Sequence, residues 1–474
     1  MRHLILRRKR TSVIGCGNKR LLTLRKKIQM RTKAHLASGL FVIFIAMFCL
    51  ANGATGLLDA IKRRDHKAVE SLINAKADVN VTQPDGASVL AWAVFLDDLK
   101  SAEMLLTAGA KVNTTDEYGE TPLTLACNNG NASLVQKLIE AGANVNVARW
   151  DGSTALMLAA NSGCVQAVNY LIEKGANVNA VEEKKKQSAL MWAIAEGHSD
   201  VAQTLIAHGA DVKAVSKSGF SPIIFAAVKN DAKSIKHLLA AGVDPNAKIT
   251  DGTPAIIIAA ANRSSEAALV LVEHGADVKC ADARGTTPLH YAAQTGDVEL
   301  VKKLIASKAD VNARTAKVPG GGNPFRPAFG ELTPLHSAAR ANQLEIMKLL
   351  VAAGADSKLK GEQGITLLMQ AAASSNVELV KYAFELDPDV KAVTEKGMSV
   401  MHASVTSIGI GADQPEICKV IRFLAEKGAP LDERNAAGRT PIDVADVLPL
   451  DQAVDLLTEL IIKSGSKPKT PTKR

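Results

Sequence analysis

Histidine is the residue type in this chain best suited to acid–base chemistry, because the pKa of imidazole lies near neutral pH. Three histidines stand out as a series, at 290, 336 and 402. The others in the body of the chain are scattered, without a serine, cysteine or carboxylate at a spacing that would mark a nucleophile and its base. They are His66, His198, His208, His237 and His274. The sequence therefore shows no catalytic pattern built on these five side chains.

Other reactive residues also lack partners. The six cysteines include no Cys-x-x-Cys pair, and no two histidines have metal-ligand spacing. The cysteines occupy unrelated places, so we expect no disulfide framework. They are Cys16, Cys49, Cys127, Cys164, Cys280 and Cys418. The glycine run at 320–322 lacks the lysine and hydroxyl residue of a phosphate-binding loop. We predict no catalytic residue, no metal and no cofactor.

Glycine spacing indicates which elements position these side chains. Glycines recur at 86, 119 and 152, at 219, 252 and 285, and at 364 and 397, in steps of 33 residues within each group. A fixed period of this length is typical of stacked copies of one supersecondary unit. Such copies bury their apolar faces against one another, and none of them can do so alone.

Each copy contains signals for two short helices. In one copy Thr121 is suited to cap a helix and Pro122 to occupy its first position, where the missing N–H has no cost. Gly130 would end that helix, and a second helix follows with apolar residues at i, i+3 and i+4 spacing. Gly142 then fits a left-handed residue after its end. The period therefore predicts pairs of helices, each preceded by a glycine turn.

These slots resemble the ankyrin repeat. Thr-Pro-Leu-His occurs at 287–290 and 333–336, and Gly-Ala-Asp/Asn-Val-Asn/Lys occurs at 142–146, 175–179, 209–213 and 275–279. The resemblance implies an all-α solenoid of about twelve stacked helix-turn-helix units with short hairpin fingers, over residues 55–463. It also implies that His290, His336 and His402 share one framework slot and make local hydrogen bonds.

The copies depart from the pattern in a few places. Lys186 stands where the turn glycine is expected, and the copies from 251 and 363 lack Thr-Pro. Thirteen extra residues predict an enlarged finger at 317–330. Eight extra residues predict an insertion in the loop between paired helices at 405–415. In repeat proteins insertions map to loops and often to the binding face.

The N-terminal residues have a different character. Residues 1–50 contain 12 lysines and arginines and no acidic residue, and an apolar run occupies 40–51. We interpret residues 1–54 as a basic leader. It holds either a signal peptide, for export to the periplasm or the extracellular space, or a signal anchor at 36–51 that keeps the protein in a membrane. Met30 is a possible true start, with residues 1–29 an upstream artefact or part of a transit segment. The short leader and sparse cysteines favour a bacterial source.

Net charge argues against a nucleic-acid partner. The chain carries +9 in total, but the part after residue 50 is at −3, and the repeats without the basic residues from 463 onward are at about −8. A nucleic-acid binder is expected to have a basic footprint. The tail at 464–474 is basic and low in complexity, and we expect it to be disordered.

The surface is therefore the part of the molecule expected to carry function. In ankyrin repeats the partners are usually proteins, bound by finger tips and by the residues after the inner alanine pair. The finger candidates are Tyr118, Trp150, Phe220, Phe325, Arg326 and Phe329. The candidates after the alanine pair include Asn128, Asn129, Asn161, Gln294 and Arg340. Trp150 and Phe325 are the first choices as anchors, because aromatic residues are enriched in binding hot spots.

We expect a monomeric, non-enzymatic scaffold that recognises a protein partner, with any membrane contact confined to the N-terminal apolar segment. Two alternatives stay open. One is a membrane-tethered structural spacer or assembly scaffold, and the other is an enzyme whose site lies in the insertion at 318–330. Trp92 and Trp192, which directly precede inner alanines, are expected in the core.

Overall fold

The computed structural model describes residues 56–317, 330–406, 413–448 and 450–465. Regular structure in these residues consists of helices in consecutive pairs, without a strand. The chain divides into two compact units, one ending at Val243 and the other beginning at Asp244. Each unit is a stack of six helix pairs. The predicted number of about twelve copies is therefore confirmed.

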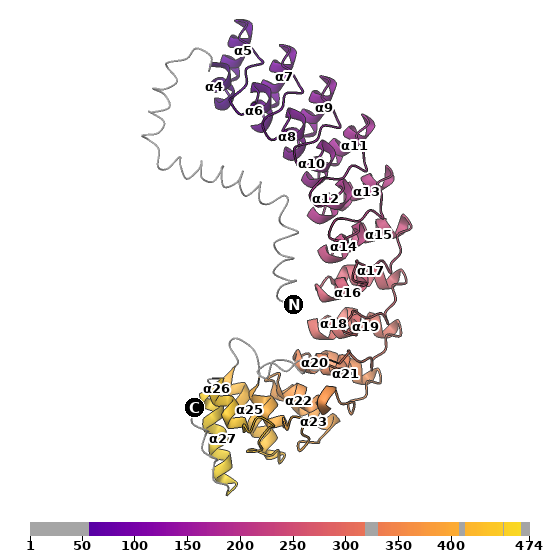
Figure 1. Ribbon diagram of the computed structural model, residues 1–474, viewed down its shortest axis with the longest axis vertical. Coiled ribbons are helices and arrows are strands. Elements are labelled where there is room, and N and C mark those ends of the chain that lie inside the picture. Colours follow the sequence, from indigo (N-terminus) through magenta and orange to yellow (C-terminus); the bar gives the residue numbers. More distant parts are fainter. Residues whose placement is uncertain (1–55, 318–329, 407–412, 449, 466–474) are drawn as a thin grey trace, which may run out of the picture. The chain divides into compact units, whose positions relative to one another are not determined.

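In the first unit the two helices of each pair form an inner and an outer row (Figure 1). The inner helices are α4 (Gly56–Arg63), α6 (Val89–Phe95), α8 (Pro122–Asn129), α10 (Ala155–Ser162), α12 (Ala189–Glu196) and α14 (Pro222–Lys229). The outer helices are α5 (His66–Asn74), α7 (Leu99–Thr107), α9 (Ala132–Glu140), α11 (Val165–Glu173), α13 (Ser199–Ala207) and α15 (Ala232–Ala240). Inner helices pack on inner neighbours, as α10 does on α8 and α12.

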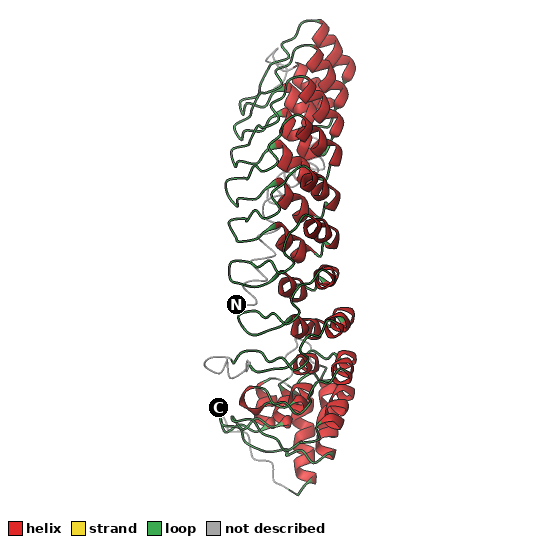
Figure 2. Cartoon of the chain, turned by 90° about the vertical axis from the view of Figure 1, so that its right-hand side faces the viewer, coloured by secondary structure: helices red, strands yellow, loops and turns green. Residues whose placement is uncertain are grey.

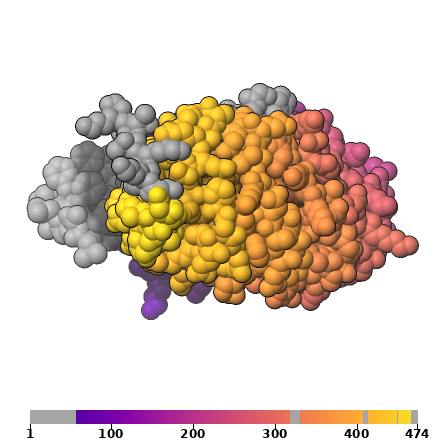
Figure 3. Space-filling view, turned by 90° about the horizontal axis from the view of Figure 1, so that it is seen from below, coloured from indigo at the N-terminus to yellow at the C-terminus, as the bar shows by residue number. Residues whose placement is uncertain are grey.

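The second unit repeats this arrangement. Its inner helices are α16 (Ala255–Ala261), α18 (Pro288–Thr295), α20 (Pro334–Arg340), α22 (Leu367–Ala372), α24 (Val400–Val405) and α26 (Pro441–Val447). Its outer helices are α17 (Ser265–Glu273), α19 (Val298–Ala306), α21 (Leu344–Ala352), α23 (Val377–Leu386), α25 (Gln414–Glu426) and α27 (Asp451–Lys463). A short 3-10 helix, η2 (Glu362–Gly364), precedes α22. Figure 3 views the end of this unit that α27 closes.

Local sequence signals set where the helices begin and end. The Thr121 side chain accepts a hydrogen bond from the Thr124 backbone N–H, and the Thr124 hydroxyl accepts one from the Thr121 backbone N–H, which is a capping box. Pro122 occupies the first turn of α8, and Gly130 ends the helix with a φ of 71°. A residue with a Cβ would be strained at that φ. The predicted roles of these residues are confirmed.

Small residues make close stacking possible. Ala126 in α8 and Ala159 in α10 are fully buried between neighbouring inner helices. Outer helices bury one apolar face, as α9 does with Leu134, Val135 and Leu138. The apolar face of each outer helix thus packs against the inner row. The core of each unit extends along the whole stack of repeats.

Loops that join one pair to the next project to one side of the helices (Figure 2). In the first unit the tips of successive fingers are joined by backbone hydrogen bonds. These run from Glu117 N to Asp85 O (2.9 Å), from Trp150 N to Tyr118 O (3.3 Å), from Glu183 N to Asp151 O (3.0 Å) and from Lys217 N to Lys185 O (2.7 Å). Each finger is therefore held by its neighbour as well as by its own helices.

The loop after each outer helix is tied to the next repeat. The Asn113 side chain accepts a hydrogen bond from Asn144 N (2.9 Å) and donates one to Gly142 O (3.0 Å). Asn146 makes the same two bonds with Asn177 N and Gly175 O one repeat later. These asparagines satisfy backbone groups that the helix ends leave open.

Predictions about the irregular regions fall partly outside the described residues. The leader at 1–54, its apolar segment at 36–51 and nearly all of the tail at 464–474 lie there. So do residues 318–329 of the enlarged finger and 407–412 of the loop insertion. Thr315 N donates to Leu332 O (3.0 Å) at the base of that finger. Among the described helices, none has the length and apolar character needed to cross a membrane.

Candidate interaction surface

Two aromatic side chains project from neighbouring fingers of the first unit. Tyr118 is 48% exposed and Trp150 is 49% exposed, although apolar side chains of this size are normally covered. Their backbones are joined by the hydrogen bond from Trp150 N to Tyr118 O. These two predicted site residues thus lie next to each other on neighbouring finger tips.

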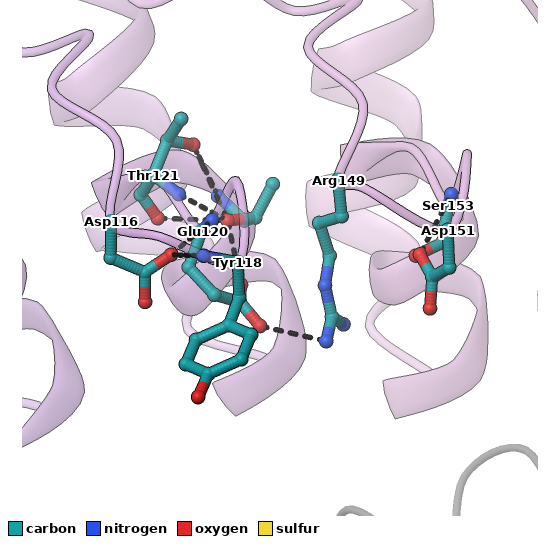
Figure 4. A network of polar contacts seen from close by, with 8 residues as sticks. Asp116, Tyr118, Glu120, Thr121, Arg149, Asp151 and Ser153 are labelled. Carbon is teal, nitrogen blue, oxygen red and sulfur yellow. Dashed lines mark hydrogen bonds and ion pairs between the residues drawn. The ribbon is translucent and has the colours of Figure 1, made fainter. Parts of the chain in front are cut away.

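The turn that carries Tyr118 is fixed by a carboxylate. Asp116 Oδ1 accepts hydrogen bonds from Tyr118 N and Glu120 N, both at 2.8 Å. Gly119 sits between them with a φ of 74°. Figure 4 shows the Tyr118 ring projecting from this turn. Asp116 therefore fixes the direction in which the ring leaves the backbone.

An ion pair joins this finger to the next one. A guanidinium nitrogen of Arg149 lies 2.8 Å from Glu120 Oε1, with the two side chains only 10% and 20% exposed. In Figure 4 the Arg149 side chain lies between the two fingers and extends toward Glu120. Arg149 Nε is buried and has no hydrogen-bond partner among the described residues. Spacing within one repeat does not reveal this pair, because its two members lie in different repeats.

A lysine covers part of the second aromatic ring. Lys184 Nζ lies 3.9 Å from the centroid of the Trp150 ring, within the range of a cation–π interaction. Lys184 belongs to the charged run at 182–186. Within this run Glu182 is buried, at 2% exposure, and accepts hydrogen bonds from the backbone N–H groups of Lys184, Lys185 and Gln187. Lys186 takes a φ of 53° in the place of the expected glycine.

Asparagines line the inner helices beside these fingers. Asn128 and Asn161 are half-buried at the same slot of α8 and α10, and Asn129 is exposed. The Asn129 side-chain Nδ2 donates to the backbone O of Val94 (2.9 Å). The backbone O of Asn161 lies 3.1 Å from His198 Nε2. Neutral amides therefore occupy the positions after the inner alanine pair, as the sequence placed them.

Other predicted aromatics have packing roles. Phe220 is half-buried and meets Phe225 of its own repeat edge to face at 5.7 Å, so it is not an exposed anchor. Trp192 is buried as expected, at 9% exposure. Trp92 is only half-buried, and Lys62 Nζ lies 4.4 Å from its ring centroid.

The remaining candidates belong to the second unit or are not described. Gln294 and Arg340 are exposed after the alanine pairs of α18 and α20. Phe325, Arg326 and Phe329 lie outside the described residues. The described part of the predicted surface is therefore concentrated in the first unit, with Tyr118, Trp150 and the three asparagines.

The histidine series forms hydrogen bonds within the framework. In α18, His290 Nδ1 accepts from Thr287 N (3.2 Å), and Nε2 lies 2.8 Å from Leu332 O of the next repeat. Burial lowers the pKa of His290 to about 4, although its bond to Leu332 opposes the shift. In α24, His402 makes the equivalent contact with Arg439 O (3.0 Å). Burial also lowers the pKa of His402, and both rings serve to join one repeat to the next.

His336 differs from the other two in one respect. Its Nδ1 accepts from Thr333 N (3.4 Å), but its Nε2 is buried and has no hydrogen-bond partner among the described residues. Burial, together with the positive charge of Arg314 and, in acid, repulsion from a protonated His290, lowers the pKa of His336 to about 4. At the corresponding place in the next repeat, Ile365 O accepts from Gly361 N (2.9 Å), next to the irregular turn η2.

One histidine has a carboxylate partner that sequence spacing did not reveal. His66 Nε2 lies 3.0 Å from Asp98 Oδ1, and the Ser101 hydroxyl donates to Asp98 Oδ2 (2.6 Å). Burial alone would raise the pKa of Asp98, but the hydrogen bonds from Ser101 and His66 outweigh it and hold the pKa below its ordinary value. In a catalytic triad the histidine stands between the serine and the carboxylate. Here the carboxylate is in the middle, so the cluster caps α7.

Burial disfavours the thiolate form of two of the described cysteines. Burial raises the pKa of the Cys127 thiol well above its usual range and that of Cys280 to about 12. Cys127, Cys164, Cys280 and Cys418 are free thiols. No cluster of three or more potential metal ligands occurs in the part of the chain that the structure describes.

Comparison with known proteins agrees with the repeat pattern. A family model described as "Ankyrin repeats (3 copies)" matches residues 109–182, 146–216, 180–249, 223–315 and 335–435, which is more than half of the chain. This chain belongs to the ankyrin repeat family. The ankyrin repeat domain of human ASB11 is similar at 24% identity over 46% of this chain and 96% of that domain, with a TM-score of 0.42. Among curated proteins, none matches.

Membership of the family bears on the expected activity. Ankyrin repeat proteins are generally non-enzymatic scaffolds, and they typically bind other proteins.

Proposed function

We propose that this ankyrin repeat protein is a non-enzymatic scaffold that recognises a protein partner through the first unit. The observation that carries the proposal is the pair of half-exposed rings of Tyr118 and Trp150 on fingers joined by a backbone hydrogen bond. Tyrosine and tryptophan are the residues most enriched among interface hot spots. These two rings lie outside the packed core, so their exposure is better explained by binding than by a role in folding.

Preorganisation supports the same function. The Tyr118 turn is held by Asp116, and its finger is tied to the next by the ion pair of Arg149 and Glu120. A surface that is already ordered loses little conformational entropy on binding, so more of the contact energy appears as affinity.

Cross-linking in cells tests the proposal directly. The full-length protein and its Trp150→Ala variant would be cross-linked, purified and compared for co-purifying proteins. We expect at least one partner whose recovery falls about ten-fold with Trp150→Ala. Tyr170→Ala is the matched control, because Tyr170 also lies near a lysine, Lys174, but is carried by the outer helix α11. Partners recovered equally from all three proteins would contradict the proposed site.

We also propose that the leader exports the scaffold or anchors it in a membrane. The support is the basic residues before position 36 and the apolar run at 40–51. Mass spectrometry of the N-terminus of the mature protein distinguishes the two fates. A start near residues 51–54 means cleavage and a free exported protein, whereas an intact leader means an anchor. Cytoplasmic recovery of the intact chain in soluble form would contradict both.

A further inference from the structure

Charge is unevenly distributed along the fingers of the first unit. The fingers at 82–87, 115–120 and 148–153, called the acidic finger row below, carry net charge −4, whereas the next two, at 181–187 and 215–220, carry +2 together. The acidic members are Asp85, Asp116, Glu117, Glu120 and Asp151, against the single base Arg149. Asp85 and Glu117 are exposed. The row thus presents negative potential beside Tyr118 and Trp150.

The inner helices of the same three repeats are uncharged. The helices α6, α8 and α10 contain no lysine, arginine, aspartate or glutamate. On α8 and α10, Asn128, Asn129 and Asn161, called the amide floor, supply donors and acceptors in their place. Neighbouring helices stack about 8–10 Å apart, and an extended chain advances about 3.3 Å per residue. Successive amides therefore match every third residue of an extended peptide.

The Trp150 ring already associates with a cation. Lys184 Nζ lies 3.9 Å from the Trp150 ring centroid. Trp150 thus lies in an environment in which a cation is attracted both by a ring and by nearby carboxylates. The same features favour lysine and arginine side chains of a ligand and disfavour acidic ones.

A separate observation concerns a buried donor within this row. The Arg149 side chain is 90% buried between the two fingers, and its Nε lacks a hydrogen-bond partner within the described residues. An unsatisfied buried donor costs free energy, and a peptide carbonyl oxygen would satisfy it after a small shift of the side chain. Its other guanidinium contact, with Glu120, stays available to hold the finger in place.

We propose that the acidic finger row and the amide floor bind an extended, lysine- and arginine-rich segment of the partner protein. This inference rests on the recognition function proposed above and adds the chemistry and conformation of the partner. The segment lies across three repeats, which corresponds to roughly nine residues. Its basic side chains meet Glu117, Tyr118 and Trp150, and its backbone meets the asparagine amides.

Peptide binding to the full-length chain tests the inference. Fluorescently labelled peptides of roughly nine residues, alternating serine with arginine, glutamate or asparagine, would be titrated and followed by anisotropy. We expect the arginine peptide to bind and to lose affinity between about 50 mM and about 200 mM salt. Glu117→Lys and Trp150→Ala should each weaken it about ten-fold. Glu173→Lys, an exposed charge reversal at the end of α11, is the matched control and should leave it unchanged.

The outcomes separate this inference from the proposed function. If the glutamate or asparagine peptide binds in a Trp150-dependent way and the arginine peptide does not, the scaffold function holds and the basic partner is refuted. If no peptide depends on Trp150 or Glu117 while cross-linked partners still do, the inference again fails alone. If neither peptides nor cross-linked partners depend on Trp150, both fail.

Discussion

Arg149 and Glu120 form a 2.8 Å ion pair between neighbouring fingers, with 10% and 20% of their side chains exposed. Most surface ion pairs add little stability, because solvent screens them. This pair is different, since it is largely covered and connects the turn of Tyr118 to the turn of Trp150. We conclude that it sets the spacing of the two rings.

Removing one member of this pair should destabilise the first unit. We expect Arg149→Ala to lower the free energy of unfolding by about 2 kcal/mol, because Glu120 would keep a partly buried charge without this cation. Urea unfolding followed by circular dichroism measures the loss, and hydrogen exchange locates it in the fingers. Arg284→Ala is the control, because Arg284 is 60% exposed and lies 3.9 Å from Asp282. Its effect should stay within about 0.5 kcal/mol, and equal losses in both variants would refute the assignment.

Two glycines with similar backbone angles should respond differently to alanine. Gly119 has a φ of 74° and Gly142 a φ of 90°, so both substitutions introduce strain of about 1–2 kcal/mol. A Cβ on Gly119 would also lie 3.1 Å from Trp150 N and 3.2 Å from Arg149 Cα, whereas one on Gly142 would meet nothing within 4 Å. We expect Gly119→Ala to cost more stability and to weaken partner binding. Equal thermal stability and equal partner binding of the two variants would show that the finger of Gly119 does not pack closely against the finger of Trp150.

The fold could be predicted from sequence because its signals act within one repeat. Thr121, Pro122 and Gly130 each fix a helix boundary through their own backbone or a neighbour three residues away. The repeat period then gives the number of such units, so about twelve helix pairs can be predicted without knowing any contact between repeats. Exposure of Tyr118 and Trp150 could also be anticipated, since finger tips lie outside the packed core.

Contacts between repeats could not be predicted in the same way. The pairs Arg149 with Glu120, Lys184 with Trp150 and His66 with Asp98 each join residues about one repeat apart. Finding them requires the register of neighbouring repeats and the direction of each side chain. A search at spacings near 33 residues would have proposed them, at the cost of many false pairs.

The capping carboxylate of α7 should matter more than that of α5. Both Asp98 and Asp65 accept a hydrogen bond from a backbone N–H of the first turn, but Asp98 is buried and also binds His66 and Ser101, whereas Asp65 is exposed. We expect Asp65→Ala to cost about 1 kcal/mol and Asp98→Ala roughly twice that, by urea unfolding at pH 7.

The same carboxylate predicts a pH dependence. The pKa of Asp98 is lowered in the folded chain, so its stabilising effect is present above the unfolded value near 3.8 and is lost as pH falls through the folded value. The difference between the wild-type protein and Asp98→Asn should therefore shrink in strong acid. A difference that stays constant down to pH 2 would mean that the charge of Asp98 plays no part.

The buried histidines should make the second unit sensitive to mild acid. In the folded chain the pKa values of His290 and His336 are lowered to about 4, below the ordinary 6.5. As pH falls from 6.5 toward 4, the unfolded chain takes up protons that the folded chain excludes, so stability decreases. The loss is about 3 kcal/mol for each histidine, and none is expected above pH 6.5. The same slot holds Thr124, Met157 and Met191 in the first unit, so its unfolding should depend less on pH in this range.

Methionine substitutions separate the two histidines. Replacing His336 removes a buried donor that has no acceptor among the described residues. His336→Met should therefore keep or raise the free energy of unfolding at pH 7.5. It should also reduce the dependence of that free energy on pH between 6.5 and 4. His290→Met loses the bond to Leu332 O and should cost about 1 kcal/mol at pH 7.5 while flattening the same dependence. Urea titrations at several pH values, with hydrogen exchange to assign the unfolding unit, measure both effects. If the two variants lose stability equally at pH 7.5, then His336 Nε2 has an acceptor in solution and the contrast drawn between the two rings is wrong.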